Sequence, residues 1–390
     1  MTIKFLFLGA LDNHEADFLP FLSRHGYDVT VINTSNWSFP RKIIGTGIPV
    51  YNLYENTKIR FLFNGRMGWF GKAAFYSLAE KARFTHSKVK EVIKQEGIEV
   101  IYGSWGSHSL PELRSVQEFN VPIVYEFLTY PTNVLSFAVK TENVLNRSIM
   151  NRLDGRVLAT QRMLDYMKNV FGIHYGQNLV FTECYSERFF YRRRLPRLSE
   201  HDDGPHVIFT GSDVYEVLPQ IEEIMRRGIH VYVYQMKGFE QRLQGLKSKG
   251  FGHTFKKFDY NKLLDGTFAT FMTQFDACLV TYDFRRASTL DRFYNSIPDR
   301  FSFALTAGIP IVMPRGYLKG CEEILNKHQI GFTYAGYDDL KNKLNKNDLM
   351  DYYRNNAFVK SKFFTLENNF GRIDKFLRNT CLYHKIKRGD

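Results

Sequence analysis

The stretch Ile297–Pro314 constrains the fold of this chain more than any other. It reads IPDRFSFALTAGIPIVMP, in which Pro298 opens a short helix, Gly308 ends it, and Ile309–Met313 forms an apolar strand. Proline is favoured in the first turn of a helix and glycine just after its end. A strand that is apolar along its whole length is buried on both faces, as in a parallel sheet between helices. The stretch therefore predicts an α/β protein, with the basic side chain of Arg300 in the first turn of the helix.

The same alternation of strands and helices runs along the rest of the chain in two series. The first opens with the apolar strand Ile3–Leu8, a helical stretch at Glu15–His25 and a strand at Tyr27–Asn33. The second opens with the strand Val207–Thr210, and the chain closes with a helix at Phe370–Leu382. Repeated β-α-β units are typical of doubly wound parallel sheets, in which ligands gather at the carboxyl ends of the strands. The sequence therefore predicts two Rossmann-like domains with a cleft between them.

Length and a local change of composition set the expected domain boundaries. A chain of 390 residues is too long for one compact core. Tyr191–Gly204 contains four arginines, then acidic residues, and few residues that can pack, which indicates a linker, with a surface loop as the alternative. The predicted parts are an N-terminal Rossmann-like domain at 1–190, a linker at 191–205, a second domain at 206–365, and a C-terminal helix at 366–390 that returns to the first domain.

Charge and cysteine content narrow the class of protein. The formal net charge is +13, which favours an anionic partner such as nucleic acid, an anionic membrane surface or a phosphorylated substrate. The four cysteines are scattered, with no CxxC pair. A disulfide framework or a zinc site is therefore not predicted, and a reducing cytosol fits.

The sequence predicts contact with a membrane surface rather than a membrane span. No apolar run approaches the roughly 18–20 residues that cross a bilayer, and the short apolar opening indicates a first strand rather than a signal peptide. Lys58–Lys72 mixes basic and bulky apolar residues, as in segments that lie on anionic membranes. We expect a cytoplasmic protein, peripheral on the cytoplasmic face of the membrane; the alternative is a loop packed on its own domain.

Several segments of the second half resemble the GT-B glycosyltransferases, most closely family 4 and related bacterial polysaccharide enzymes. Val207–Ser212 resembles the family's opening donor-domain strand and glycine turn, and Phe275–Tyr282 resembles its Asp-Ala-hydrophobic strand. Asp299–Val312 resembles its basic helix followed by Ala-x-Gly-x-Pro-Val-Val. Glu322–Leu325 and Gln329–Gly331 resemble its downstream helix and strand. The resemblance implies a GT-B fold, a nucleotide-sugar donor bound mainly by the second domain, an acceptor on the first domain, and neither metal nor cofactor.

The two glutamates of retaining members of the family are missing. Those glutamates stand eight residues apart, the second of them five before the glycine. Counted back from Gly308, their places are taken by Phe303 and Asn295. Asn295 can only hydrogen-bond the donor sugar, so the ordinary retaining mechanism is not predicted.

A departing nucleoside diphosphate needs positive charge or oriented N–H groups. Arg300 offers a fork of donors matched to phosphate beside the N–H groups of a helix start. Arg285 and Arg286 follow a strand at its carboxyl end, as phosphate ligands or as ordinary surface arginines. Gly211 and Ser212 form a turn at which a phosphate can approach the backbone closely. Asn295 and Ser296 are polar residues that precede the helix. The predicted donor-binding residues are Gly211, Ser212, Arg285, Asn295, Ser296 and Arg300.

An inverting transfer also needs a base that takes the proton of the acceptor hydroxyl. Glu126 ends an apolar strand of the first domain, where a glutamate costs free energy unless it is paired. Asp12 and His14, in the loop after the first strand, are rival candidates, and His108 is a third. The sequence leaves the choice among them open.

The predicted function is transfer of a sugar from a nucleotide donor to a glycan or lipid-linked acceptor, in polysaccharide or glycoconjugate biosynthesis. The missing glutamates keep two alternatives open, a non-catalytic GT-B partner of an active transferase and a GT-B sugar epimerase. A nucleic-acid-binding protein is the remaining alternative. It is disfavoured because the basic residues are dispersed and no zinc, RRM or KH signature is present.

Overall fold

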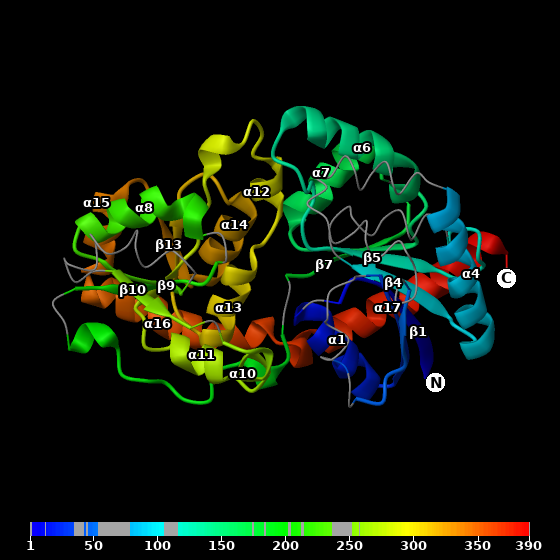
Figure 1. Cartoon of the computed structure of the whole chain (residues 1–390), viewed down its shortest axis with the longest axis horizontal. Coiled ribbons are helices and arrows are strands. Elements are labelled where there is room, and N and C mark those ends of the chain that lie inside the picture. The colour runs from blue at the N-terminus through cyan, green and yellow to red at the C-terminus, as the bar shows by residue number, and fades with distance from the viewer. Residues whose placement is uncertain are drawn as a thin grey trace. The chain divides into compact units, whose positions relative to one another are not determined.

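The computed structural model divides the chain into two compact units (Figure 1). Unit 1 comprises Met1–Thr182 with Phe370–Asp390, and unit 2 comprises Glu183–Asn369. The chain thus passes between the units at 182–183 and again at 369–370, whereas the composition placed the first boundary at 190–191. The structure describes residues 2–11, 13–34, 43, 46–53, 79–104, 116–173, 175–182, 185–201, 204–211, 214–235, 252–256 and 258–389.

Unit 1 is built on a parallel sheet whose central strands are buried on both faces. Within the described residues the sheet has seven strands in the order β3-β2-β1-β4-β5-β6-β7. Figure 1 shows α6 and α7 on one side of this sheet and α1 and α17 on the other, which explains why strands β1, β4 and β5 are almost entirely buried. The strands are β1 (Ile3–Gly9), β2 (Tyr27–Asn33), β3 (Val50–Asn52), β4 (Val100–Ser104), β5 (Ile123–Phe127), β6 (Gly155–Leu158) and β7 (Gln177–Val180). The helices are α1 (Asn13–Arg24), α4 (Ala79–Glu96), α6 (Ser136–Met150), α7 (Gln161–Phe171) and most of α17 (Leu366–Arg388).

The last helix, α17, packs against unit 1 along its length. The hydroxyl of Tyr27 donates to Asp374 at 2.7 Å, and the ring of Phe21 contacts that of Phe370. Burial, followed by this hydrogen bond, raises the pKa of Tyr27. At Gly155, in β6, an added Cβ would lie 2.9 Å from side-chain atoms of Phe376 and Thr380, so the glycine allows the helix to approach the sheet closely.

Unit 2 repeats this design with six described strands in the order β10-β9-β8-β11-β12-β13. Counted along the unit, this is the doubly wound order 3-2-1-4-5-6, whose switch point lies between β8 and β11. The strands are β8 (His206–Phe209), β9 (His230–Tyr234), β10 (Gly252–Phe255), β11 (Ala277–Leu279), β12 (Ile311–Pro314) and β13 (Gly331–Tyr334). The longer helices are α8 (Val214–Arg226), α13 (Asp299–Ala307), α14 (Lys319–His328), α15 (Tyr337–Leu344) and α16 (Asn347–Ser361). A cluster of buried aliphatic and aromatic residues joins α8, α15 and α16 to one face of the sheet.

The sequence pattern predicts one helix over Leu264–Gln274, but the structure interrupts it. The structure has two short helices instead, α10 (Tyr260–Leu264) and α11 (Thr267–Met272). Between them Gly266 has φ of 74°, and a Cβ there would lie 2.2 Å from the carbonyl oxygen of Phe190, so only glycine fits. The sequence pattern also predicts a helix over 239–249, which lies outside the described residues.

The segment expected to be a linker is hydrogen-bonded to unit 2. The backbone N–H groups of Arg192 and Leu195 donate to the hydroxyls of Thr270 and Thr273, at 2.8 and 2.9 Å. Arg197 forms ion pairs with Glu200 and, at 3.1 Å, with Asp351 of α16. In the structure this arginine-rich stretch therefore belongs to the packed surface of unit 2.

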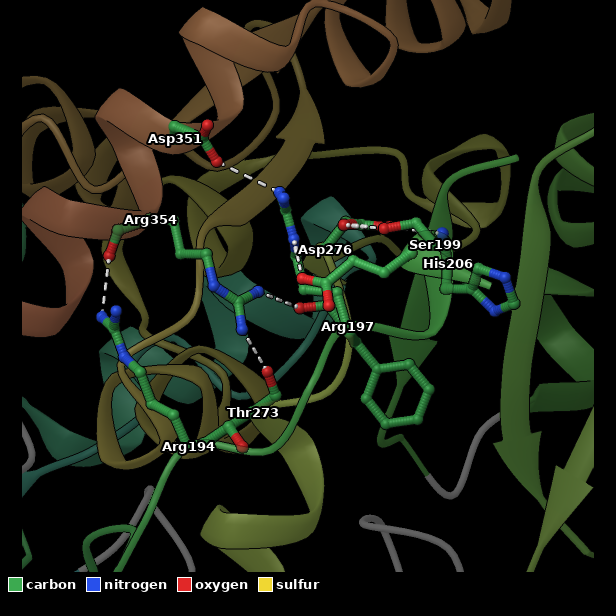
Figure 2. A network of polar contacts seen from close by, with 10 residues as sticks. Arg194, Arg197, Ser199, His206, Thr273, Asp276, Asp351 and Arg354 are labelled. Atoms are coloured by element: carbon green, nitrogen blue, oxygen red, sulfur yellow. Dashed lines mark hydrogen bonds and ion pairs between the residues drawn. The ribbon is translucent and has the colours of Figure 1, made fainter. Parts of the chain in front are cut away.

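Asp276, which directly precedes β11, is central to this packing (Figure 2). Its carboxylate accepts the Ser199 hydroxyl at 2.7 Å and the backbone N–H of His206 at 2.8 Å. Arg354 donates to the carbonyl oxygens of Thr273 and Phe275 nearby, and burial lowers the pKa of Arg354 to about 10. The network lies at the amino ends of β8 and β11, the edge of the sheet opposite to the one where ligands bind.

We therefore predict a structural role for Asp276. Asp276→Asn should lower the free energy of unfolding by about 1–3 kcal/mol, because the buried N–H of His206 or the partly buried hydroxyl of Ser199 loses its carboxylate acceptor. The midpoint of thermal or chemical unfolding measures this effect. Asp351→Asn is the control and should cost less than about 1 kcal/mol, because that carboxylate is exposed. A larger effect of Asp351→Asn than of Asp276→Asn would contradict the prediction.

Candidate functional site

A cluster of buried polar residues lies at the carboxyl edge of the unit 1 sheet. His14 and Glu15 occupy the first turn of α1, which follows β1. Ser104 ends β4 and pairs in register with Glu126 of β5. Because β1 pairs with β4 and β4 with β5, the start of α1 meets the ends of these strands. All four of these side chains are buried.

Within this cluster, two of the rival base candidates are in direct contact. His14 Nε2 lies 3.3 Å from Glu126 Oε2, and the hydroxyl of Tyr102 donates to the same oxygen at 2.7 Å. Burial, followed by the charge of Glu126, raises the pKa of Tyr102 well above its ordinary value. The phenol therefore stays protonated and holds the carboxylate in place.

A second buried carboxylate, that of Glu15, belongs to the same cluster. The Ser104 hydroxyl donates a hydrogen bond to Glu15, and Glu15 lies at the positive end of α1, where a negative charge is stabilised. The arrangement can accept a proton at His14, because Glu126 would stabilise the imidazolium that forms. Asp12 and His108, the other two candidates, lie outside the described residues.

In unit 2, Arg300 lies at the switch point of the sheet but is enclosed by protein. It stands in the first turn of α13, as expected, and is 6% exposed. Its guanidinium lies over the rings of Phe209 and Tyr282, at 4.5 and 4.3 Å from their centroids, and Nη1 donates to the Thr281 carbonyl oxygen at 2.6 Å. Phe209 ends β8, and Thr281 and Tyr282 follow β11, so the structure fixes a positive charge between these two strand ends.

Two exposed arginines lie at the same edge of the sheet. Arg285 and Arg286 form a short 3-10 helix with Phe284 after β11, and their side chains are 69% and 70% exposed. Both pair with the buried carboxylate of Asp283, at 2.8 and 3.2 Å. The hydrogen bond from Arg285, followed by the charges of both arginines, lowers the pKa of Asp283. Two cations share one anion, so the cluster keeps a net positive charge. Its exposed guanidinium groups also keep N–H donors that a ligand can reach.

Sequence reasoning missed Asp283, Tyr102 and the Glu15–Ser104 pair. For Asp283 a signal was present, because an aspartate followed within three residues by two arginines stands a few residues after a buried strand. For Tyr102 and Ser104 the only signal was polar atoms in an otherwise apolar strand. Their partners are distant in the sequence, so the pairing needed the sheet order.

The remaining candidates in unit 2 lie in buried positions. Gly211 follows β8 and is buried, whereas Ser212 lies outside the described residues. Asn295 ends the short helix α12 (Asp291–Asn295), and Ser296 follows it; both are buried. Within the described part of the chain, the Ser296 hydroxyl is buried without a hydrogen-bond partner.

Phe303 shows what replaces the family's second glutamate. Its side chain is buried in α13 and packs against the rings of Tyr185 and Phe268, with centroids 5.9 and 5.6 Å away. A carboxylate at this position would be surrounded by aromatic rings and would cost several kcal/mol if ionised. The aromatic packing is therefore incompatible with the acidic residue of retaining enzymes.

Neither metal ligands nor membrane spans are found in the described part of the chain. The His, Cys, Asp and Glu residues that the structure describes form no group of three able to hold a metal ion. Among the same residues, no helix is both long and apolar enough to cross a membrane. Lys58–Lys72, the segment expected at a membrane surface, lies outside the described residues.

Comparison with known proteins gives similarity in structure but not in sequence. No family model matches the chain, and no curated protein matches it. A sucrose-phosphate synthase from Thermosynechococcus elongatus has 12% sequence identity and a TM-score of 0.66 over 100% of both chains. A glycosyltransferase from Rickettsia africae has 10% identity and a TM-score of 0.67 over 98% of both chains. Anabaena HepE, solved with UDP and glucose, has 13% identity and a TM-score of 0.64, covering 97% of this chain and 100% of HepE.

These neighbours share two parallel-sheet α/β domains with this chain, and the chain is aligned with them over nearly its full length. The chain therefore has the two-domain Rossmann-like fold called GT-B, as its sequence predicted. The neighbours do not assign it to family 4.

Proposed function

We propose that this protein is a glycosyltransferase that takes a sugar from a nucleotide-sugar donor bound at the carboxyl edge of unit 2. The observation that carries the proposal is the concentration of cations at that edge. Arg285 and Arg286 expose their donors there, and the buried guanidinium of Arg300 adds a fixed positive charge. A nucleoside diphosphate is the leaving group that such charges stabilise. The structural similarity to HepE, which was solved with UDP and glucose, supports this choice of donor.

The roles follow from the chemistry of transfer. An acceptor hydroxyl gives its proton to the His14–Glu126 pair and forms a bond to the anomeric carbon of the sugar. The bond from that carbon to the β-phosphate oxygen breaks, and the nucleoside diphosphate leaves with the electron pair. Arg285 and Arg286 contact the diphosphate, while Asn295 and Ser296 hydrogen-bond the phosphate or the sugar. A base of this kind serves an inverting transfer.

For the acceptor we propose a glycan or a lipid-linked sugar, in the synthesis of a polysaccharide or glycoconjugate. The basic character of the chain, with a net charge of +13, suits a site beside an anionic membrane surface. The donor cations take the place that a metal ion has in other transferases, so we propose transfer without a metal.

The direct test is release of nucleoside diphosphate from a panel of nucleotide sugars, with and without acceptors. The proposal predicts release with at least one donor. A second candidate function, a non-catalytic GT-B partner protein, is favoured by Phe303 and Asn295 in place of the two glutamates. Donor binding without any turnover would support that candidate instead.

Asp283 is expected to position the two arginines of the donor site. Asp283→Asn should weaken binding of a nucleoside diphosphate about fivefold, because Arg285 and Arg286 lose the anion that orders them. The depressed pKa keeps Asp283 ionised at neutral pH, so the wild-type arrangement is lost only as the pH falls through that lowered value. Titration calorimetry measures the effect. The variant gains positive charge, so tighter binding would show that charge alone matters and would contradict a positioning role.

A further inference from the structure

One helix of unit 1, α6, turns large apolar side chains toward solvent. Phe137 is 57% exposed and Val144 is 72% exposed. Leu135, immediately before the helix, and Leu145 are also exposed. The helical spacing of Phe137, Val144 and Leu145 puts them on one face, away from the face that packs on the unit. A surface helix of a soluble domain usually presents polar residues there.

The charges on this exposed face have one sign. Lys140 and Arg147 are exposed beside the apolar residues. The only acidic residue of α6, Glu142, is fully buried. There it accepts hydrogen bonds from the backbone N–H of Thr132 and the side chain of Asn133. Glu142 therefore cannot pair with the two cations at the surface.

Helix α16 in unit 2 has a comparable apolar exposure but mixed charge. Val359 is 59% exposed, and Phe363, just after this helix, is 58% exposed. The acidic side chains of Asp348 and Asp351 are exposed on the same helix. Exposed apolar area alone therefore does not distinguish α6. What distinguishes α6 is that its exposed bulky apolar residues are accompanied by cations and by no exposed carboxylate.

That combination is typical of a helix lying on an anionic bilayer, with apolar side chains at the level of the headgroups and cations among the lipid phosphates. The last turns of α17, also in unit 1, repeat it with exposed Leu382 and Ile386 beside Lys385 and Arg388. Figure 1 shows α6 on the outer side of its unit, away from the sheet.

We propose that the α6 face, defined as Leu135, Phe137, Lys140, Val144, Leu145 and Arg147, docks on an anionic lipid bilayer. Phe137 and Val144 enter the boundary between headgroups and acyl chains, and Lys140 and Arg147 face anionic headgroups. Docking would bring unit 1 close to a lipid-linked acceptor, and this consequence rests on the proposed function. The docking itself does not depend on a bound sugar donor.

The test is co-sedimentation of the full-length protein with phosphatidylcholine vesicles, with and without phosphatidylglycerol. The protein should bind the anionic vesicles, and less at high salt. The double variant Phe137→Ser/Val144→Ser should bind about tenfold or more weakly, because two apolar anchors are lost. The matched control Val359→Ser/Phe363→Ser removes the same two residue types from unit 2 and should bind like the wild type.

Three results would overturn the proposal. They are no binding by the wild type, equal binding by both double variants, and loss of a dimer on size-exclusion chromatography when only the α6 face is altered. The last result would assign the face to a second copy of the chain. Stabilisation of the same variants by a nucleotide sugar separates this proposal from the proposed function. If docking is lost and stabilisation remains, the α6 face alone is responsible for docking.

Discussion

Glu126→Gln is expected to abolish sugar transfer while leaving donor binding unchanged. Glutamine has nearly the same shape and can still accept the Tyr102 hydroxyl, but it carries no charge to stabilise a protonated His14. Loss of this stabilisation should weaken general-base catalysis and lower kcat by about 10²–10⁴-fold. Steady-state kinetics give the rate, and calorimetry with the nucleotide sugar gives the donor affinity.

Glu142→Gln is the matched control for this variant. Glu142 is also a fully buried glutamate of unit 1 that accepts several hydrogen bonds, but it lies in α6 and takes no part in the proposed reaction. Its replacement should lower stability and leave transfer within a few-fold of wild type. Transfer retained by Glu126→Gln would instead move the base to the first loop, which holds Asp12 and His14.

The double variant Arg285→Ala/Arg286→Ala should weaken donor binding about a hundredfold. In the proposed donor site, each guanidinium would make charge-assisted hydrogen bonds to phosphate worth roughly 1.5–3 kcal/mol. Both side chains are exposed and pair only with Asp283 among the ion pairs found in the described chain. The fold should therefore survive their removal. Measurement of the dissociation constant for nucleoside diphosphate gives the result.

The same unit supplies a control of the same composition. Arg226 and Arg227 are also adjacent and share one carboxylate, that of Glu223. They lie at the end of α8, and Arg227 also pairs with Asp338 of α15, so carboxylates occupy both guanidinium groups. Arg226→Ala/Arg227→Ala removes the same net charge and should leave donor affinity nearly unchanged. If both double variants weakened binding equally, long-range charge rather than contact at the donor site would be responsible.

Local patterns predicted the elements well where strand and helix signals were strong. The strand Tyr27–Asn33 and the helix start near Asp299 were predicted because apolar runs and the Pro and Gly signals are local. The packing of 191–201 on unit 2 was not predicted, because its partners, such as Thr270, Thr273 and Asp351, are supplied by distant parts of the chain.

The sequence predicted which residues the candidate site contains, but not how these residues are arranged in space. Arg300 is where the helix signal placed it, but its burial depends on Phe209 and Tyr282, which come from two different strand ends. Glu126 and His14 were rivals in the sequence. They are in contact in the structure because the sheet order puts β5 two strands from β1, and sequence periodicity does not reveal strand order.

The most direct test of the central claim is a thermal-shift screen of the wild-type protein against nucleotide sugars and nucleoside diphosphates. A ligand that binds only the folded state raises the melting temperature, by an amount that grows with its concentration. We predict a rise with at least one nucleotide sugar and its diphosphate, and none with the same ligand for Arg285→Ala/Arg286→Ala. No rise with any of these ligands, or an equal rise in that variant, would contradict a donor site at the carboxyl edge of unit 2.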